Sequence, residues 1–372
     1  MTGQKLRIGV LGGTFDPPHY GHLLLAESAC DAAGLDRVLF MPTHIQPFKQ
    51  GQEVSPNDER LQMLRLALNG NPRFHITTVE TDRKGVSYTI DSLRELRDSA
   101  VAREILAEGE KLAFIVGTDM FLMIEKWYRA DELLREFDII VGIRSGGGAG
   151  VRQDEAVALA EKIRREYGTR VDLIDNPPFG ISSTMVRDRL ASGESLRYIV
   201  PDDVRHYLAV RAAEKKSRWA HTKLVIGLAS ELAARNDESA HKAAVAALFH
   251  DLCKDGSKPE NALAHAGEAA DLMRSEYGIE DEDILNAVRY HTTGRAGMSK
   301  LEMIVFLADT LEPSRRYEGV ARLRGKVYED LHEGALMVLK SLNEFIIKED
   351  KEPARDSLEA IEWLAGIVDS AE

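Results

Sequence analysis

The sequence contains few cysteines and no long apolar run. Its two cysteines, Cys30 and Cys253, lie far apart without a spacing pattern, which argues against a disulfide framework and favours a reducing compartment. No apolar run approaches the ~20 residues that a membrane helix requires. The first residues, MTGQKLRIGVLGGTF, contain no long apolar segment and no small-residue cleavage site. We therefore expect a cytoplasmic protein with neither a signal peptide nor a membrane span.

An excess of positive charge is also missing. The 372 residues carry a formal net charge of −13. Because binding to duplex nucleic acid draws largely on clustered Lys and Arg, we expect no nucleic-acid partner. Nucleotides remain compatible with this charge, since they need only a few local cations and backbone amides. The sequence leaves open whether the chain forms a homo-oligomer.

Short β-rich runs alternate with amphipathic stretches over the first half of the chain. Such alternation predicts an α/β doubly wound parallel sheet with helices on both faces. The expected strands are residues 6–11, 37–42, 74–79, 111–116, 138–143 and 171–174, and the expected helices are 23–33, 56–68, 89–97, 130–135 and 153–167.

The second half has a different pattern. A polar stretch at residues 211–218 is followed by segments with helical apolar spacing, and β-branched runs become rare. The expected helices are residues 220–235, 239–254, 262–277, 281–290, 300–311 and 327–347. We therefore predict two domains, residues 1–210 and an all-α domain at residues 211–372.

The most informative segment of the first half is GGTFDPPHYGH, residues 12–22. Gly12 and Gly13 follow a buried-type strand, and glycines let the backbone turn sharply and approach a phosphate. The helix that follows presents free N–H groups and positive partial charge to an anion. His19 and His22 lie three residues apart, and Gly21 lets the chain crowd there, so both imidazoles can face one phosphate.

A second phosphate motif lies near residue 182. Ser182 is a good N-cap, and Ser183 and Thr184 fall in the first helical turn, where amides and hydroxyls can bind an anion. Arg187 would face the same phosphate one turn later.

Over residues 6–209 these motifs resemble the HxGH nucleotidyltransferase superfamily, and specifically the nicotinate mononucleotide adenylyltransferases. The resemblance implies adenylyl transfer from ATP, with Mg²⁺, to nicotinate mononucleotide, which gives nicotinate adenine dinucleotide and pyrophosphate. It implies catalytic roles for His19, His22, Lys49 and Arg187, with Phe48 standing where the family usually has histidine. The implied ATP-binding residues are Gly12, Gly13, Thr14, Phe15, His19, His22, Gly117, Asp119, Ile181, Ser182, Ser183 and Arg187. The implied substrate-binding residues are Ser87, Tyr88, Thr89 and Trp127.

The choice of substrate is less constrained than the reaction. Related enzymes on this scaffold adenylylate pantetheine phosphate or flavin mononucleotide, or cytidylylate other phosphates. Tyr88 and Trp127 favour a pyridine substrate, while nicotinate over nicotinamide follows from the resemblance alone.

The helical half carries a series of metal-type residues that begin or end apolar helices. His and Asp suit Fe, Mn, Mg or Zn. Asp309 closes an apolar helix, where a carboxylate is costly unless it meets a cation. The expected spacing also puts His250 and Lys254 on one helical face. The candidate ligands are His221, His250, Asp251, His265, His291 and Asp309.

This order of residues resembles the HD superfamily of metal-dependent phosphohydrolases. More closely, residues 290–294, 298–301, 308–313 and Arg316 resemble the HD-domain hydrolases that cleave diadenosine tetraphosphate symmetrically into ADP. The resemblance implies two Fe ions, or Mn, catalytic roles for Asp251 and Lys254, and phosphate contacts from Lys254 and Arg316. The segment after His265 departs from that family's usual run. Two alternatives stay open: a regulatory or oligomerising nucleotide-binding module, and hydrolysis of another phosphate ester.

Overall fold

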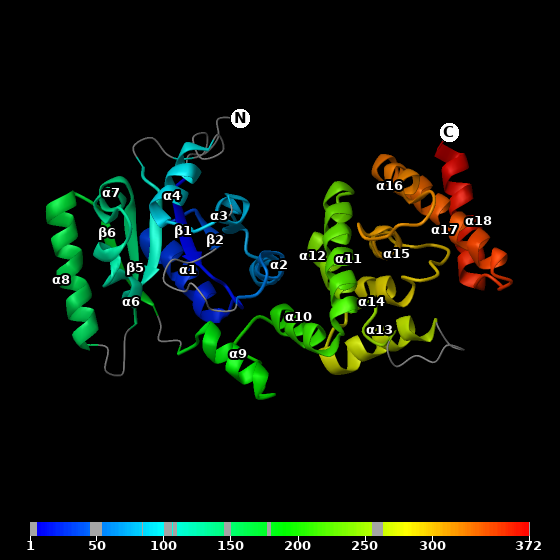
Figure 1. Cartoon of the computed structure of the whole chain (residues 1–372), viewed down its shortest axis with the longest axis horizontal. Coiled ribbons are helices and arrows are strands. Elements are labelled where there is room, and N and C mark those ends of the chain that lie inside the picture. Colours follow the sequence, from blue (N-terminus) through cyan, green and yellow to red (C-terminus); the bar gives the residue numbers. More distant parts are fainter. Residues whose placement is uncertain are drawn as a thin grey trace. The chain divides into compact units, whose positions relative to one another are not determined.

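The computed structural model describes residues 6–44, 54–83, 85–99, 106, 110–144, 150–176, 180–254 and 263–371. The chain divides into two compact units, Met1–Arg205 and His206–Glu372 (Figure 1). The division falls within helix α10 (Asp202–Ala213), which also contains the boundary expected at residues 210 and 211.

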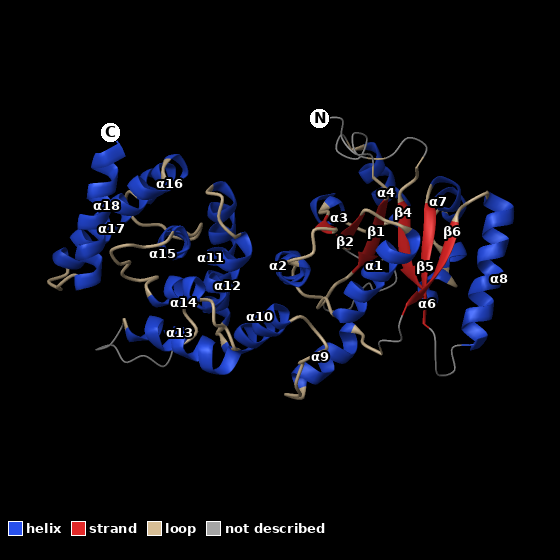
Figure 2. Cartoon of the chain, turned by 180° about the vertical axis from the view of Figure 1, so that it is seen from behind, coloured by secondary structure: helices blue, strands red, loops and turns tan. Residues whose placement is uncertain are grey.

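Unit 1 is built on a six-stranded sheet in the order β3-β2-β1-β4-β5-β6, and every neighbouring pair is parallel. Helices lie on both faces of this sheet (Figure 2), as the alternating pattern predicts. Its strands are β1 (Ile8–Gly13), β2 (Arg37–Pro42), β3 (Phe74–Ile76), β4 (Ala113–Gly117), β5 (Asp138–Arg144) and β6 (Val171–Asn176). Its helical elements are α1 (Tyr20–Ala33), α2 (Asn57–Leu68), α3 (Val79–Arg83), α4 (Thr89–Asp98), α6 (Thr118–Phe121), the 3₁₀ turn η2 (Ile124–Lys126), α7 (Ala130–Glu136), α8 (Gly150–Tyr167) and α9 (Ser183–Ala191).

Both faces of the sheet are buried because alternate residues of each strand enter different cores. In β1, Val10 packs in one apolar cluster with Phe114, and Leu11 packs in another with Ala26. The chain leaves β1 toward β2 on one side and returns at β4 on the other, so the strand order reverses between β1 and β4. In open α/β sheets, ligands bind beyond the carboxyl ends of the strands at such a reversal.

Unit 2 is helical. Its core is centred on α15 (Lys300–Leu311), in which every residue from Leu301 to Ala308 is buried. The other helices are α11 (Lys216–Arg235), α12 (Ala240–Phe249), α13 (Ala264–Tyr277), α14 (Glu282–Arg289), α16 (Val320–Glu329), α17 (Leu331–Lys348) and α18 (Arg355–Ala371).

Two expected helices of unit 2 are wrong in detail. The single helix expected at residues 327–347 is two helices, because Asp330 leaves helical geometry and its carboxylate accepts the Glu333 amide at 2.8 Å as the N-cap of α17. The helix expected at residues 239–254 ends at Phe249. His250 and Lys254 therefore do not share a helical face.

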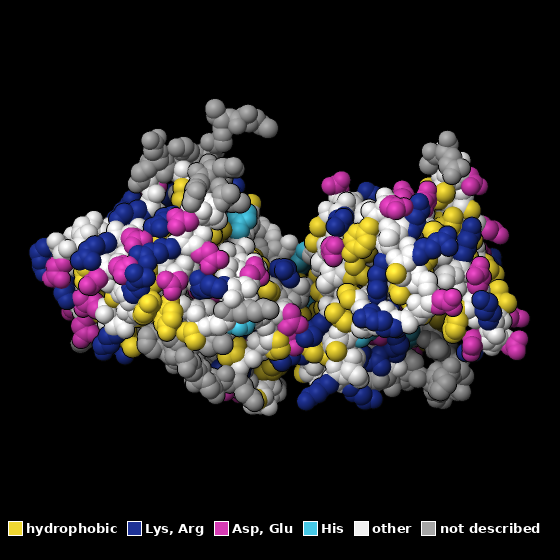
Figure 3. Space-filling view, turned by 45° about the horizontal axis from the view of Figure 1, so that its top comes forward, with side chains coloured by type: hydrophobic (Ala, Val, Ile, Leu, Met, Phe, Trp, Pro, Cys, Tyr) yellow, Lys and Arg dark blue, Asp and Glu magenta, His cyan; other side chains and the backbone are white. Residues whose placement is uncertain are grey.

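Charged side chains of both signs are intermixed over the surface seen in Figure 3. Within the described part of the chain, no helix combines the length and the apolar character that a membrane span needs.

Candidate functional sites

The loop between β1 and α1 brings the two histidines of the first motif together. The rings of His19 and His22 stack with their centroids 3.7 Å apart and their planes 21° from parallel. The His19 amide donates to His22 Nδ1 at 3.3 Å, so this pair caps the helix that it begins. A Cβ on Gly21 would lie 3.0 Å from His19 Nδ1, which explains why a glycine stands between the two histidines in the sequence. The helix therefore starts at Tyr20, three residues before the expected position.

The N-terminus of α9 lies against the same loop. Ser182 caps α9, since its hydroxyl accepts the Met185 amide at 3.2 Å, as its position in the sequence predicts. The Ser183 hydroxyl donates to the Pro17 carbonyl at 3.0 Å, and Arg187 Nη1 donates to the Asp16 carbonyl at 2.6 Å. Two helix N-termini thus border one space.

That space is a cavity of about 410 Å³, which we call the phosphate cavity. Of the residues expected to bind ATP, it is lined by Gly12, Gly13, Thr14, Phe15, His19, His22, Gly117, Ile181, Ser182, Ser183 and Arg187. Asp119 does not line it. The Asp119 side chain is 63% exposed and pairs with Arg152 instead. Lys49, with Phe48, lies outside the described residues.

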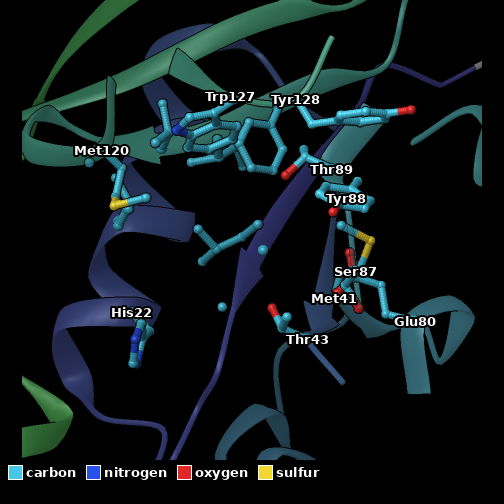
Figure 4. Close-up of a pocket in the computed structure, with 18 of the residues that line it drawn as sticks. His22, Met41, Thr43, Glu80, Ser87, Tyr88, Thr89, Met120, Trp127 and Tyr128 are labelled. Carbon is cyan, nitrogen blue, oxygen red and sulfur yellow. The ribbon is translucent and has the colours of Figure 1, made fainter. Parts of the chain in front are cut away.

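A second cavity, of about 490 Å³, adjoins the first and shares lining residues with it. Figure 4 shows this second cavity. We call it the aromatic cavity because Tyr88, Trp127 and Tyr128 form part of its wall. The centroids of the Tyr88 and Tyr128 rings lie 4.4 Å apart. The buried Trp127 Nε1 has no hydrogen-bond partner in the described structure. All four expected substrate residues, Ser87, Tyr88, Thr89 and Trp127, line this cavity. Gly12, Gly13, His22, Leu25, Gly117 and Met120 line both cavities.

The sequence reasoning missed several residues of these cavities. Thr43, Glu80 and Tyr128 line the aromatic cavity, and Asp16 lines the phosphate cavity. Burial raises the pKa of the Glu80 carboxyl, and hydrogen bonds from Ser92 and Ser87 offset part of that rise. No local pattern marks Glu80, whereas Asp16 lies within the motif of residues 12–22 and Tyr128 directly follows Trp127.

In unit 2 the six candidate ligands converge from three helices, α11, α13 and α15, and from the turns that follow α12 and α14. Asp251 Oδ1 lies 3.5 Å from His265 Nε2 and 3.7 Å from His291 Nε2, whereas Oδ2 lies 3.6 Å from His250 Nε2 and 4.0 Å from His221 Nε2. The residues therefore form two metal-type groups that share Asp251.

Asp309 lies on the side of the first group. Its Oδ1 is 3.0 Å from His221 Nε2 and 3.9 Å from His250 Nε2. Burial raises the pKa of the Asp309 carboxyl, but the hydrogen bond with His221 and the nearby His250 outweigh it and hold that pKa well below its usual range. The apolar end of α15 thus carries an ionised carboxylate that points toward imidazoles.

The histidine rings are oriented for metal binding. His250 Nδ1 donates to the Ala247 carbonyl and His291 Nδ1 to the Val288 carbonyl, each at 2.7 Å, so the Nε2 lone pair of each ring faces the cluster. Burial lowers the pKa of His250 to about 4, which keeps the ring neutral, the form that binds a metal. Metal-ligating histidines almost always donate a hydrogen bond from the N–H of their other ring nitrogen in this way. The donor set and its orientation fit a pair of metal ions.

The ring of His221 is held by the carboxylate of Glu312, which the sequence analysis does not name as a site residue. Glu312 is 1% exposed, and its Oε1 lies 3.3 Å from His221 Nδ1. The Ser314 amide and hydroxyl each donate to Glu312 at 2.6 Å, which orients the carboxylate toward His221.

Cationic side chains line a cavity of about 500 Å³ that His221 and Asp251 of the cluster also line. Lys254 Nζ lies 2.7 Å from Asp251 Oδ2, and Arg315 Nη2 lies 2.8 Å from Asp309 Oδ1. Arg218, 3.4 Å from Asp251 Oδ2, and Arg316 line the same cavity. Sequence reasoning named Lys254 and Arg316 but missed Arg218 and Arg315, because arginines outside a motif resemble ordinary surface charges.

Comparisons with known proteins match the two units separately. Residues 10–189 match the family model described as cytidylyltransferase-like, and residues 218–314 match the model of the HD domain. A nicotinate-nucleotide adenylyltransferase of Bacillus subtilis is 37% identical over 202 residues, which cover 54% of this chain and 95% of that protein. A probable nicotinate-nucleotide adenylyltransferase of Geobacillus thermodenitrificans is 39% identical over 202 residues, which cover 54% of this chain and 83% of that protein.

Among solved structures, a predicted HD superfamily hydrolase involved in NAD metabolism from Clostridium acetobutylicum is 30% identical, with a TM-score of 0.40; the match covers 44% of this chain and 96% of that one. The family match of residues 218–314 identifies the helical unit as an HD domain. The sequence identity to the curated relatives, and the share of their length that it covers, show the family: the chain belongs to the nicotinate-nucleotide adenylyltransferase family.

Proposed function

We propose that unit 1 transfers the adenylyl group of ATP to nicotinate mononucleotide, and that the HD domain cleaves diadenosine tetraphosphate symmetrically into two ADP. Membership in the nicotinate-nucleotide adenylyltransferase family supports the first activity. The observation that carries it is the pair of adjoining cavities, one bordered by two helix N-termini and the other by aromatic rings.

The two cavities suit an in-line displacement at the α-phosphorus of ATP. The phosphate of nicotinate mononucleotide would attack that phosphorus directly, and pyrophosphate would leave, so no protein nucleophile is required. His19, His22 and Arg187 border the phosphate cavity, where they would neutralise the charge that develops on the phosphates. Mg²⁺ would reach the site with ATP, held by phosphate and water oxygens.

The aromatic cavity accounts for the second substrate. A pyridine ring in this cavity would lie against Trp127, and its phosphate would approach His22, which lines both cavities. Holding the two reactants in this geometry is the main catalytic device available here.

Replacing His22 by Ala tests this assignment. Because His22 is the one described residue common to both cavities that has an ionisable side chain, we expect turnover to collapse. Loss of this helix cap should lower the melting temperature of unit 1 only slightly. Formation of nicotinate adenine dinucleotide, followed by chromatography, measures the turnover. A His22→Ala protein with normal turnover would contradict the role, and a wild-type protein that accepts only flavin mononucleotide or pantetheine phosphate would contradict the substrate.

The HD domain is a hydrolase-type domain. Asp251 belongs to both metal-type groups, and the cavity beside it is lined by four cationic side chains. This arrangement is the observation that carries the second activity. The first metal ion would be held by His221, His250, Asp251 and Asp309, and the second by Asp251, His265 and His291. Two such ions would polarise a phosphoanhydride and make a water molecule more acidic, with iron as the proposed metal and manganese as the alternative.

Side chains around the cluster would bind the phosphates of the substrate and orient the imidazole rings. Lys254, Arg218, Arg315 and Arg316 provide a binding surface for several phosphates in succession, which suits a polyphosphate better than a monophosphate. Glu312 and the two helical carbonyls keep the imidazole rings in one orientation.

The test incubates metal-reconstituted full-length protein with diadenosine tetraphosphate and resolves the products by ion-exchange chromatography. We expect ADP alone, and we expect it to disappear in His250→Ala and Asp251→Asn. Formation of ATP and AMP would contradict the symmetrical reaction. Absence of cleavage with any metal would favour a nucleotide-binding module or another phosphate ester as substrate.

A further inference from the structure

One arginine of unit 1 is buried deeply and lines neither cavity. Arg60, on α2, is 1% exposed and is among the largest fully buried side chains in the described part of the protein. Burial lowers the pKa of its guanidinium, while Asp16 and Glu80 act in the opposite direction. An arginine nevertheless stays charged in proteins, and a buried charge is costly unless its donors are all satisfied.

Arg60 satisfies its donors with backbone carbonyls from three separate segments. Nε donates to Ser55 at 3.1 Å, Nη1 to Thr14 at 2.6 Å and Nη2 to Thr43 at 2.8 Å. Nη2 also donates to the Asn57 side-chain oxygen at 2.5 Å. The three carbonyls belong to the loop after β1, the residue after β2 and the segment before α2, so one planar guanidinium joins elements that are distant in the sequence.

Two of these carbonyls belong to residues of the candidate active site. Thr14 lines the phosphate cavity and Thr43 lines the aromatic cavity. The network continues through Asp16, whose Oδ2 accepts the Ser55 amide at 3.0 Å and whose carbonyl accepts Arg187 Nη1 at 2.6 Å. Arg60 is thus hydrogen-bonded, through the Thr14 carbonyl, to the loop that carries His19 and His22.

We propose that Arg60 is a positioning residue for adenylyl transfer, which sets the phosphate loop against the wall of the aromatic cavity and so fixes the approach of the two substrates. The proposal rests on the adenylyltransferase function proposed above. The planar guanidinium is needed because its donors diverge in fixed directions to three carbonyls, and a lysine ammonium, with three donors on a flexible stem, cannot reproduce this geometry. Displacement of reacting groups by about 1 Å can cost about 100-fold in rate.

The experiment compares Arg60→Lys and Arg60→Met with the matched variant Arg94→Met in the full-length protein. Arg94 also makes several hydrogen bonds in unit 1, to Glu132 and Glu136 on α7, but it lines neither cavity. Each variant is assayed for kcat, for KM of ATP and of nicotinate mononucleotide, and for thermal unfolding. All rates are expressed per folded molecule.

We expect Arg60→Lys to lower kcat by about 10- to 100-fold and to raise KM for ATP, because the charge remains but the loop shifts. Arg94→Met should lower the melting temperature while its kcat stays within about 2-fold of wild type. If Arg60→Met does not fold, Arg60→Lys, which keeps the charge, carries the test.

Two results would overturn the proposal. One is wild-type kcat and KM values in Arg60→Lys. The other is a loss of activity in both Arg60 variants that matches their loss of folded protein, as a purely structural role requires. A wild-type protein without adenylyl transfer would instead overturn the function on which the proposal rests.

Discussion

Asp251 is the residue whose replacement tests the metal centre most directly. Among the described metal-type residues it alone belongs to both groups, with Oδ1 toward His265 and His291 and Oδ2 toward His250 and His221. Asp309 contacts His221 and His250 and takes no part in the other group. Substitutions at these two aspartates should therefore change the metal content by different amounts.

We expect wild-type protein to hold two metal ions per chain, Asp309→Asn about one, and Asp251→Asn close to none. Loss of groups that only orient a ligand costs about 10- to 100-fold in metal affinity. Loss of a direct carboxylate ligand should cost at least about 100-fold, or about 2.8 kcal/mol per site. Asp251→Asn applies this loss to both sites, whereas Asp309→Asn applies it to one.

The assay is anaerobic reconstitution with iron or manganese, gel filtration, and measurement of bound metal per chain by mass spectrometry. Circular dichroism and adenylyl transfer by the same samples show whether both units remain folded. Two metal ions in Asp251→Asn, or none in Asp309→Asn, would refute the shared-ligand arrangement. Equal losses in both variants would show that the sites are not divided as the distances indicate.

Three further predictions concern packing, pH and the aromatic cavity. Gly334→Ala should destabilise unit 2 by about 1–3 kcal/mol, because the new Cβ would lie 2.7 Å from Val327 Cα. Gly325→Ala, whose Cβ meets nothing within 4 Å, should stabilise it by about 0.5–1 kcal/mol; thermal unfolding separates the two, and equal shifts would contradict the packing argument. Hydrogen bonding from Arg94, opposed in part by burial, lowers the pKa of Glu136 to about 2 from 4.5, so its stabilising contribution is complete above pH 4.5 and is lost as the pH falls toward 2. Melting of Glu136→Gln between pH 7 and pH 3 should therefore show a smaller pH dependence than wild type, and an unchanged dependence would rule out this contribution. Trp127→Ala should raise KM for nicotinate mononucleotide by about 10- to 100-fold through lost stacking, with a much smaller effect on KM for ATP; steady-state kinetics with Trp363→Ala as the control would expose an effect that is not specific.

Features that depend on neighbours along the chain could be predicted from the amino-acid sequence. Alternating apolar runs predicted the parallel sheet, and Ser182 was predicted as an N-cap that the structure contains. The spacing of His19, Gly21 and His22 predicted that both imidazoles can face one phosphate, and both rings line the phosphate cavity. Periodicity, capping and glycine geometry act over a few residues, so a single sequence displays them.

The partners of buried polar groups depend instead on how distant segments pack together. Arg60 meets Thr14 across 46 positions of the sequence, and Glu312 meets His221 across 91. Lys254 was expected on the face of His250, but the early end of α12 turns it toward Asp251 instead. A charged side chain becomes buried only where distant segments supply its hydrogen bonds, and local sequence carries no record of those segments. Sequence alone therefore identified residues suited to each site, whereas the fold decided which of them share Asp251 and which side chains hold the site in place.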